Sequence, residues 1–305
     1  MQIFQSWQGL ETHGASAAIG NFDGVHLGHQ AVLDLARAHG PLGVVTFEPH
    51  PRQFFAPDAP PFRLMNAEAK RNRLEKLGVE YLYELGFDGA LAGLSPREFA
   101  HDVLAKGLGL SHVVVGADFF FGKKRAGNAE MLRDFGAEFG FGVTIAELVE
   151  TDSREISSTN IRNALAAGDP REAAAMLGHW HRIEGEVIHG EKRGRELGFP
   201  TANMSITDLH PPRFGIYAVK VDVLSGPHKG SYNGAGSIGV RPMFGENTPN
   251  LESYLFDFDG DLYGAHLSVA LVEYLRGEEK FDGLEALIAQ MDADCAQARV
   301  ILADV

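Results

Sequence analysis

The sequence contains a single cysteine, Cys295, among its 305 residues. An intrachain disulfide needs two cysteines and a thiolate metal cluster needs several, so both are excluded. Apolar runs such as 113–115 fall far short of the roughly 20 residues that a membrane-spanning helix needs. The N-terminus also lacks the basic start and apolar core of a signal peptide. We therefore expect a cytoplasmic protein with no membrane partner.

Positive charge is also scarce. The chain has 27 lysines and arginines against 41 aspartates and glutamates, which gives a formal net charge of -14. Phosphate contacts along a nucleic acid need a basic surface, so no nucleic-acid partner is expected. A small anionic substrate in a local basic pocket remains compatible with this charge. Hydrophobic residues make up 45% of the chain, and this excludes a disordered or fibrous protein.

Two different patterns divide the chain near residue 180, and we expect domains at 1–180 and 181–305. In the first, short apolar runs alternate with helical patterns, which predicts an α/β fold with a parallel, Rossmann-like sheet. Its strands are expected at 17–19, 42–47, 81–85, 112–115 and 143–148, and its helices at 26–38, 67–77, 96–105, 129–139, 160–167 and 170–177. In the second, runs of period two predict a small antiparallel β-barrel followed by a terminal helix. Those runs are 183–188, 216–223, 251–258 and 267–275, and the helix is 283–301.

The first expected strand is joined to the first long helix by a glycine-containing segment with two histidines. Glycine lets the backbone approach a ligand closely, and a helix N-terminus offers free N–H groups that suit phosphate. The two imidazoles can donate hydrogen bonds to oxygens that gain charge in a transition state. The alternative is a glycine turn with two surface histidines; a metal site lacks a third ligand nearby in the sequence. The residues are Gly20, Asn21, Phe22, Asp23, Gly24, His26 and His29.

A run of hydroxyl residues, Ser157, Ser158 and Thr159, opens another expected helix, and Arg162 lies one turn further on. Hydroxyls, helix N–H groups and a guanidinium together suit a triphosphate. The alternative is an ordinary Ser/Thr helix cap.

The barrel region begins with a glycine- and arginine-rich loop that contains Gly190 and Arg195. Such a loop is cationic and can fold over phosphates. Beyond it, Thr201 and Asn203 would face the same side of an extended strand and offer oxygen ligands suited to Mg²⁺.

Glu252 is expected on the largely aromatic face of a strand, beside Tyr254 and Phe256. Desolvation on such a face would favour a basic, reactive carboxylate. An exposed strand glutamate is the alternative.

Several of these segments together resemble one family, the bacterial bifunctional riboflavin kinase/FMN adenylyltransferases, also called FAD synthetases. Residues 20–30, GNFDGVHLGHQ, resemble the HxGH signature of nucleotidyltransferases and the adenylyltransferase half of that family. The segments VTFEPHP at 45–51 and ISSTNIR at 156–162 are also similar to it. In the barrel, residues 190–203 resemble the riboflavin kinase signature GxxxGRxLGFPTAN.

The resemblance implies two reactions with ATP, riboflavin, FMN and FAD as small-molecule partners and Mg²⁺ as the metal. The C-terminal domain would phosphorylate riboflavin to FMN, with Glu252 as base and Thr201 and Asn203 at the metal. The N-terminal domain would adenylylate FMN to FAD and release pyrophosphate, with His26, His29 and Arg162 stabilising the transition state. Nucleotide would bind at 20–24, 157–159, Gly190 and Arg195. Flavin would bind near Asp118, Lys123 and Arg299.

Two positions depart from the family pattern. Phe120 replaces a residue that is often polar, and Lys123, which begins a basic triplet, could supply the missing charge or be a solvated surface residue. Met243 replaces a threonine in the kinase half, from which we expect weaker kinase kinetics.

Two rival functions remain open at this point. One is a nucleotidyltransferase for another phosphate substrate, with the barrel as a flavin-binding accessory. The other is a flavin or nucleotide sensor that binds without turnover.

Overall fold

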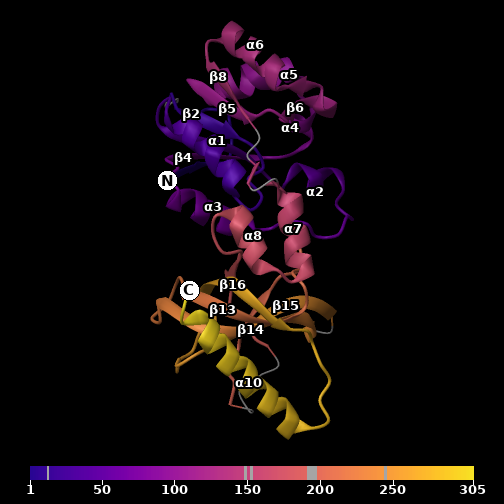
Figure 1. Ribbon diagram of the computed structural model, residues 1–305. Coiled ribbons are helices and arrows are strands. Elements are labelled where there is room, and N and C mark those ends of the chain that lie inside the picture. The colour runs from indigo at the N-terminus through magenta and orange to yellow at the C-terminus, as the bar shows by residue number, and fades with distance from the viewer. Residues whose placement is uncertain (12–13, 148–149, 152–153, 191–197, 244–245) are drawn as a thin grey trace. The chain divides into compact units, whose positions relative to one another are not determined.

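A computed structural model describes all residues except 12–13, 148–149, 152–153, 191–197 and 244–245 (Figure 1). The chain divides into two compact units. One unit consists of 1–59 with 70–156, and the other of 60–69 with 157–305. The second unit therefore includes residues 60–69, which interrupt the first unit in the sequence.

The first unit is built on a six-stranded sheet whose paired strands all run parallel. The central strands are continuous buried apolar runs, because a parallel sheet is covered on both faces. The strand order is β1, β4, β3, β2, β5, β8. The strands are β1 (Gln2–Phe4), β2 (Ser16–Ile19), β3 (Leu42–Glu48), β4 (Tyr81–Gly86), β5 (His112–Gly116) and β8 (Gly142–Ala146).

This strand order creates a ligand site by topology. From β2 the chain proceeds to β3 and β4 on one side of β2, and then returns to β5 on its other side. Open parallel sheets bind ligands beyond the carboxyl ends of the strands at the point where the order reverses. The Gly20–His29 segment follows β2 at that point. The predicted Rossmann-like arrangement is confirmed.

The helices of the first unit begin where their cap residues predict. Ser95 and Glu98 form a capping box, and Asn128 caps the helix that follows it, so both predicted starts are confirmed. The helix expected at 96–105 continues beyond its first turn as a π-helix. The helices are α1 (Leu27–Arg37), α2 (Pro51–Phe55), α3 (Ala67–Lys76), α4 (Gly89–Gly93), α5 (Pro96–Glu98), the π-helix η1 (Phe99–Gly107), the short 3₁₀ helix η2 (Lys123–Arg125) and α6 (Ala129–Phe139). Two short hairpins pair β6 (Phe120–Phe121) with β7 (Gly127–Asn128), and β9 (Glu150–Thr151) with β10 (Arg154–Glu155).

The second unit is a six-stranded antiparallel sheet in the order β11, β16, β13, β14, β15, β12. A backbone hydrogen bond of 2.9 Å from Ile188 to Asn203 brings the segment after β11 beside β12, so the sheet is nearly closed. The predicted barrel is confirmed. The strands are β11 (Arg182–Glu186), β12 (Ala202–Ser205), β13 (Gly215–Val223), β14 (Gly230–Met243), β15 (Glu246–Leu255) and β16 (His266–Arg276).

The described part of the second unit contains the helices α7 (Ser158–Ala167), α8 (Pro170–Leu177) and the terminal α10 (Leu284–Leu302). Ala298 and Leu302 of α10 pack with Phe256 and Val272 on the outer face of the barrel. Figure 1 shows α10 lying obliquely beside β13 and β14 of this sheet. The cap predicted at Asp169 for α8 is confirmed. No helix in the described part of the chain is long and apolar enough to cross a membrane.

Candidate active sites

The turn between β2 and α1 has an unusual backbone conformation. Phe22, Gly24 and Val25 all adopt positive φ angles, of 52°, 92° and 47°. A β-branched residue rarely adopts this conformation, and such strain persists only where the surrounding structure enforces it. Both side chains are buried, Phe22 at 1% exposure and Val25 at 0%. Their burial therefore fixes the strained turn that leads into His26.

His26 and His29 lie together at the start of α1. His26 caps the helix, its Nδ1 accepting a 3.3 Å hydrogen bond from the backbone N–H of His29, and the two rings stack with centroids 3.7 Å apart. Because Nδ1 of His26 accepts, the neutral ring carries its proton on Nε2 and can donate from there. Burial, the neighbouring His26 and Lys70 hold the pKa of His29 well below its usual value. The pair is therefore suited to act as neutral N–H donors.

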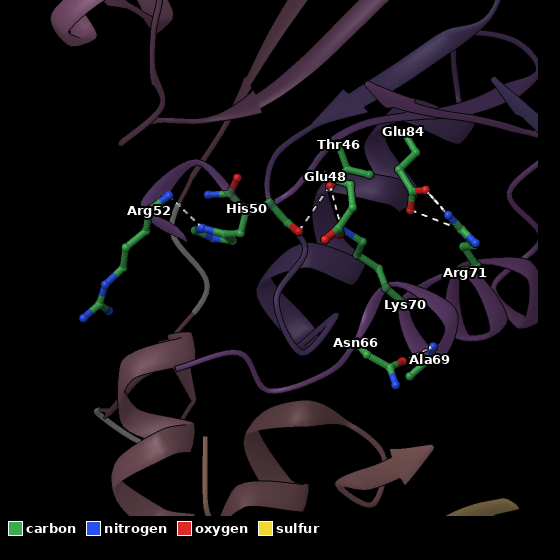
Figure 2. A network of polar contacts seen from close by, with 10 residues as sticks. Thr46, Glu48, His50, Arg52, Asn66, Ala69, Lys70, Arg71 and Glu84 are labelled. Carbon is green, nitrogen blue, oxygen red and sulfur yellow. Dashed lines mark hydrogen bonds and ion pairs between the residues drawn. The ribbon is translucent and has the colours of Figure 1, made fainter. Parts of the chain in front are cut away.

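Behind this turn, α3 presents two consecutive cations to the sheet (Figure 2). Lys70 is 3% exposed, donates to the Thr46 hydroxyl at 3.2 Å and lies 3.7 Å from the Glu48 carboxylate. Arg71 donates through Nε to both carboxylate oxygens of Glu84, at 3.2 and 3.1 Å. Sequence reasoning missed both, because their partners lie on strands that are distant in the sequence.

The predicted nucleotide motif forms the start of α7. Ser157 caps the helix by accepting a 3.2 Å hydrogen bond from the Asn160 backbone N–H. Arg162 donates to Thr159 Oγ1 at 3.0 Å and to the Phe62 carbonyl at 3.4 Å. His210, which the sequence did not suggest, donates through Nε2 to the Arg162 carbonyl at 3.1 Å.

Arg162 and its neighbours belong to the second unit, and His26 and His29 belong to the first. The two predicted parts of the adenylyl-transfer site are therefore each held by contacts within their own unit.

The predicted flavin residues of the first unit, Asp118 and Lys123, are exposed and lie in the segment after β5. In the same segment Lys124 and Arg125 both have a φ of 57°, and the Arg125 guanidinium lies 5.0 Å from the centre of the half-exposed Phe120 ring.

An aromatic cluster that sequence reasoning missed lies around α2. It comprises Phe54, Phe55 and Phe87, whose rings meet edge to face.

In the second unit, Thr201, Asn203 and Glu252, which the sequence analysis named separately, lie close together. Asn203 and Glu252 are directly paired across β12 and β15. Thr201 Oγ1 lies 3.5 Å from Glu252 Oε2, and Asn203 Nδ2 lies 3.4 Å from Thr201 Oγ1. Leu251 and Leu255 face the barrel core, so Glu252 is on the opposite face of β15. The cluster therefore joins a hydroxyl, an amide and a carboxylate.

Buried amide side chains lie beside this cluster. Asn250 Nδ2 donates to Asn203 Oδ1 at 3.4 Å, while Asn250 Oδ1 is buried without a hydrogen-bond partner among the described residues. Asn203 Nδ2 also donates to the Thr201 carbonyl at 3.3 Å, so in this structure the Asn203 Oδ1 faces Asn250. The Thr201 hydroxyl and the Asn203 amide oxygen are nevertheless the kinds of ligand that suit a hard cation that keeps most of its water. No group of three or more His, Cys, Asp or Glu suited to a metal occurs among the described residues.

The other predicted site residues of the second unit are Gly190, Arg195 and Arg299. A side chain at Gly190 would lie 2.7 Å from the Asn203 side-chain amide, so a larger residue here would require that amide to shift. Arg195 falls outside the described residues. Arg299 pairs with Asp257 through two hydrogen bonds of 2.8 and 2.9 Å and lies over the Phe256 ring.

Comparisons with known proteins agree with the two-part architecture. The sequence model of FAD synthetase matches residues 9–160, and that of riboflavin kinase matches residues 177–302. A bifunctional riboflavin kinase/FMN adenylyltransferase of Pseudomonas fluorescens is 42% identical, over 99% of this chain and 98% of its own. Its counterpart in Bacillus subtilis is 39% identical, over 92% and 90%.

A solved structure also shares the fold of the whole chain. It is a Streptococcus pneumoniae protein described as a macrolide-efflux protein, with 31% identity, a TM-score of 0.82 and 96% of each chain covered. Both family matches occur in the predicted order, and the relatives span nearly the full length. The chain therefore belongs to the family of bifunctional riboflavin kinase/FMN adenylyltransferases.

Proposed function

We propose that the two activities of this family occupy two separate sites in this chain. The observation that carries the proposal is that the two sets of reactive groups are built independently. The stacked His26 and His29 lie at the carboxyl edge of the parallel sheet, and the Thr201, Asn203 and Glu252 cluster lies on the barrel. Riboflavin kinase activity is assigned to the barrel and adenylyl transfer to the parallel-sheet unit.

In adenylyl transfer, an FMN phosphate oxygen attacks the α-phosphorus of ATP in line, and the bond to pyrophosphate breaks. No covalent enzyme intermediate is needed, so positioning and charge stabilisation account for the rate. The backbone N–H groups at the start of α1 and the histidine N–H groups stabilise the phosphate oxygens. Gly20, Asn21, Phe22, Asp23 and Gly24 shape the turn that holds the nucleotide. Ser157, Ser158, Thr159 and Arg162 supply hydroxyls and a guanidinium for its phosphates.

In the kinase reaction, Glu252 accepts the proton of the riboflavin 5′-hydroxyl as that oxygen attacks the γ-phosphorus of ATP. Gly190 and Arg195 lie in the loop proposed to cover the ATP phosphates. The Thr201 hydroxyl beside Glu252 orients the carboxylate.

Mg²⁺ is the metal proposed for both steps, and Thr201 and Asn203 are its proposed ligands on the barrel. When bound, Mg²⁺ would neutralise phosphate charge and help to orient ATP. Two neutral oxygen ligands suit an ion that retains several waters.

Flavin recognition is proposed for Asp118 and Lys123 in the first unit and for Arg299 in the second. An isoalloxazine ring needs apolar, aromatic walls, which the cluster of Phe54, Phe55 and Phe87 would provide near the end of β3. Arg299 over Phe256 offers a similar surface on the barrel.

The proposed functional domains remain 1–180 and 181–305, and a cytoplasmic location is proposed with them. The packing units divide the chain differently, because α7, α8 and the segment 60–69 lie in the barrel's unit. The adenylyltransferase motif on α7 therefore depends for its packing on residues of the barrel region, such as His210.

Chromatography of riboflavin incubated with ATP and Mg²⁺ tests the proposed function. FMN should appear first and FAD should follow, and a chelator should stop both. Adenylylation of another phosphate compound without FMN formation would favour the accessory-barrel alternative. Tight binding without any product would favour the sensor.

A further inference from the structure

Lys70 is a buried cation that the proposed mechanism does not use. Lysine is almost never fully buried unless it is paired, and this one is 3% exposed. Its partners include the Thr46 hydroxyl at 3.2 Å and the Glu48 carboxylate at 3.7 Å, both on β3 (Figure 2). Thr46 is itself fully buried. The ammonium group therefore lies under the carboxyl end of the sheet.

The hydrogen bonds around Thr46 have a defined direction. An ammonium group can only donate, so the Thr46 hydroxyl accepts from Lys70 through a lone pair. Its single hydrogen is then free for the Asn21 carbonyl, which lies 3.3 Å away. Asn21 belongs to the turn that leads to His26. Lys70 thus fixes the orientation of Thr46, and Thr46 fixes one carbonyl of the turn.

The same ammonium acts on the histidine pair through its charge. Burial, His26 and Lys70 together lower the pKa of His29. Among the described residues, His26 at the start of α1 and Lys70 on α3 are the titratable groups that exert this effect. A ring held neutral keeps one N–H to donate and does not repel the imidazole stacked on it.

We propose that Lys70 is a positioning residue for adenylyl transfer, which acts through Thr46 on the Asn21 carbonyl of the turn that leads to His26 and His29. This inference rests on the proposed function of the Gly20–His29 segment.

The adjacent Arg71 provides a matched control. It extends from the same helix and pairs with Glu84, which lies opposite Thr46 in the register of β3 and β4. The double variants Lys70→Met/Glu48→Gln and Arg71→Met/Glu84→Gln each remove one ion pair from α3 without leaving that pair's partner charged. Thr46→Val removes the hydroxyl link and keeps the Lys70 charge.

The experiment measures kcat for conversion of FMN to FAD between pH 5 and 9 in the full chain. Lys70→Met/Glu48→Gln should lower kcat about 100-fold, as expected for a misplaced reacting group. It should also move the acid limb of the kcat–pH profile, the low-pH fall in rate as His29 becomes protonated, to higher pH. Thr46→Val should lower kcat about tenfold, the effect of one hydrogen bond, without moving that limb. Arg71→Met/Glu84→Gln should change neither. Trp7 fluorescence in a Trp180→Phe background would verify that the first unit is folded.

A wild-type kcat and acid limb in folded Lys70→Met/Glu48→Gln would overturn the proposal. So would an equal shift of the acid limb in Arg71→Met/Glu84→Gln. His29→Ala in the same assay distinguishes this failure from failure of the proposed function. If His29→Ala is impaired and the Lys70 variant is normal, only the role of Lys70 is wrong. If His29→Ala retains full FAD formation, the site itself is misassigned.

Discussion

At the scale of single residues, the two histidines of the parallel-sheet unit show how local chemistry follows from packing. His26 caps α1 through Nδ1, which leaves Nε2 to donate, and the stacked His29 is kept neutral. Two imidazoles 3.7 Å apart would repel each other if both were charged. In the proposed mechanism this site would stabilise phosphate with N–H dipoles, and full positive charges would come from lysine and arginine.

Replacement of His29 by alanine should lower the rate of FAD formation about 100-fold, the usual effect of removing one transition-state donor. FMN formation should be unchanged, because the proposed kinase groups lie in the other unit. The rates are measured separately from FMN and from riboflavin. His39→Ala is the matched control, since His39 stacks on His112 outside the Gly20–His29 segment. Equal FAD yields from both variants would remove His29 from the mechanism.

His181 provides a pH-dependent prediction in the second unit. Burial, His179 and His210 lower its pKa to about 3. Below its ordinary pKa near 6.5, only the unfolded chain takes up this proton, so stability is lost as the pH falls. Between pH 7 and pH 5 the free energy of unfolding of this unit should fall by about 2 kcal/mol from this group.

The measurement uses urea unfolding followed by Trp180 fluorescence in a Trp7→Phe background, at both pH values. His181→Gln removes the titrating group and should show a correspondingly smaller decrease. Identical decreases in both proteins would refute the assignment.

At the scale of elements, one buried ion pair and one exposed ion pair join α10 to the barrel. Asp294 is 4% exposed and accepts from Arg276 of β16 at 2.7 to 3.1 Å. The pair of Arg299 with Asp257 is exposed. Removing one partner of a buried pair leaves an uncompensated charge, whereas exposed pairs contribute little.

Asp294→Ala should therefore lower the free energy of unfolding of the second unit by about 3 kcal/mol, and Arg299→Ala by less than about 1 kcal/mol. Trp180 packs with the cluster that joins α10 to the barrel, so its fluorescence reports both values in the Trp7→Phe background. Similar losses from the two variants would contradict this account of how α10 is held.

The elements also show which parts of the structure can be predicted from sequence. The buried runs of β2, β3 and β5 and the caps at Ser95, Asn128 and Asp169 are local signals, and the structure confirms them. The long strand β14 was not predicted, because its glycines suggest a loop. A side chain at Gly234 would lie 2.4 Å from the Tyr254 carbonyl, so glycine is required there by the neighbouring strand. That requirement arises only in the folded sheet.

The same limit applies to the sites. His26 with His29, and Thr201 with Asn203, are close in sequence, and their patterns predicted them. Lys70 acts on Thr46 across 24 positions, and His210 acts on Arg162 across 48. Contacts of this kind depend on tertiary packing, which no spacing rule in one sequence encodes.

At the scale of the whole molecule, the two reactions use one chain but two architectures. The product of the barrel site is the substrate of the parallel-sheet site. The packing units do not coincide with the proposed functional domains, because α7 and the segment 60–69 pack within the barrel's unit. The chain is acidic, but Lys70, Lys123 and Arg162 provide positive charge in or beside the segments proposed to bind phosphate.

The independence of the two sites is the central claim, and product chromatography of Glu252→Ala tests it most directly. The variant is supplied with ATP and Mg²⁺ and either riboflavin or FMN, and its folding is verified by the unfolding transitions of both units. We predict that it forms no FMN from riboflavin and converts FMN to FAD at close to the wild-type rate. Loss of both conversions in the folded variant would contradict the two-site account.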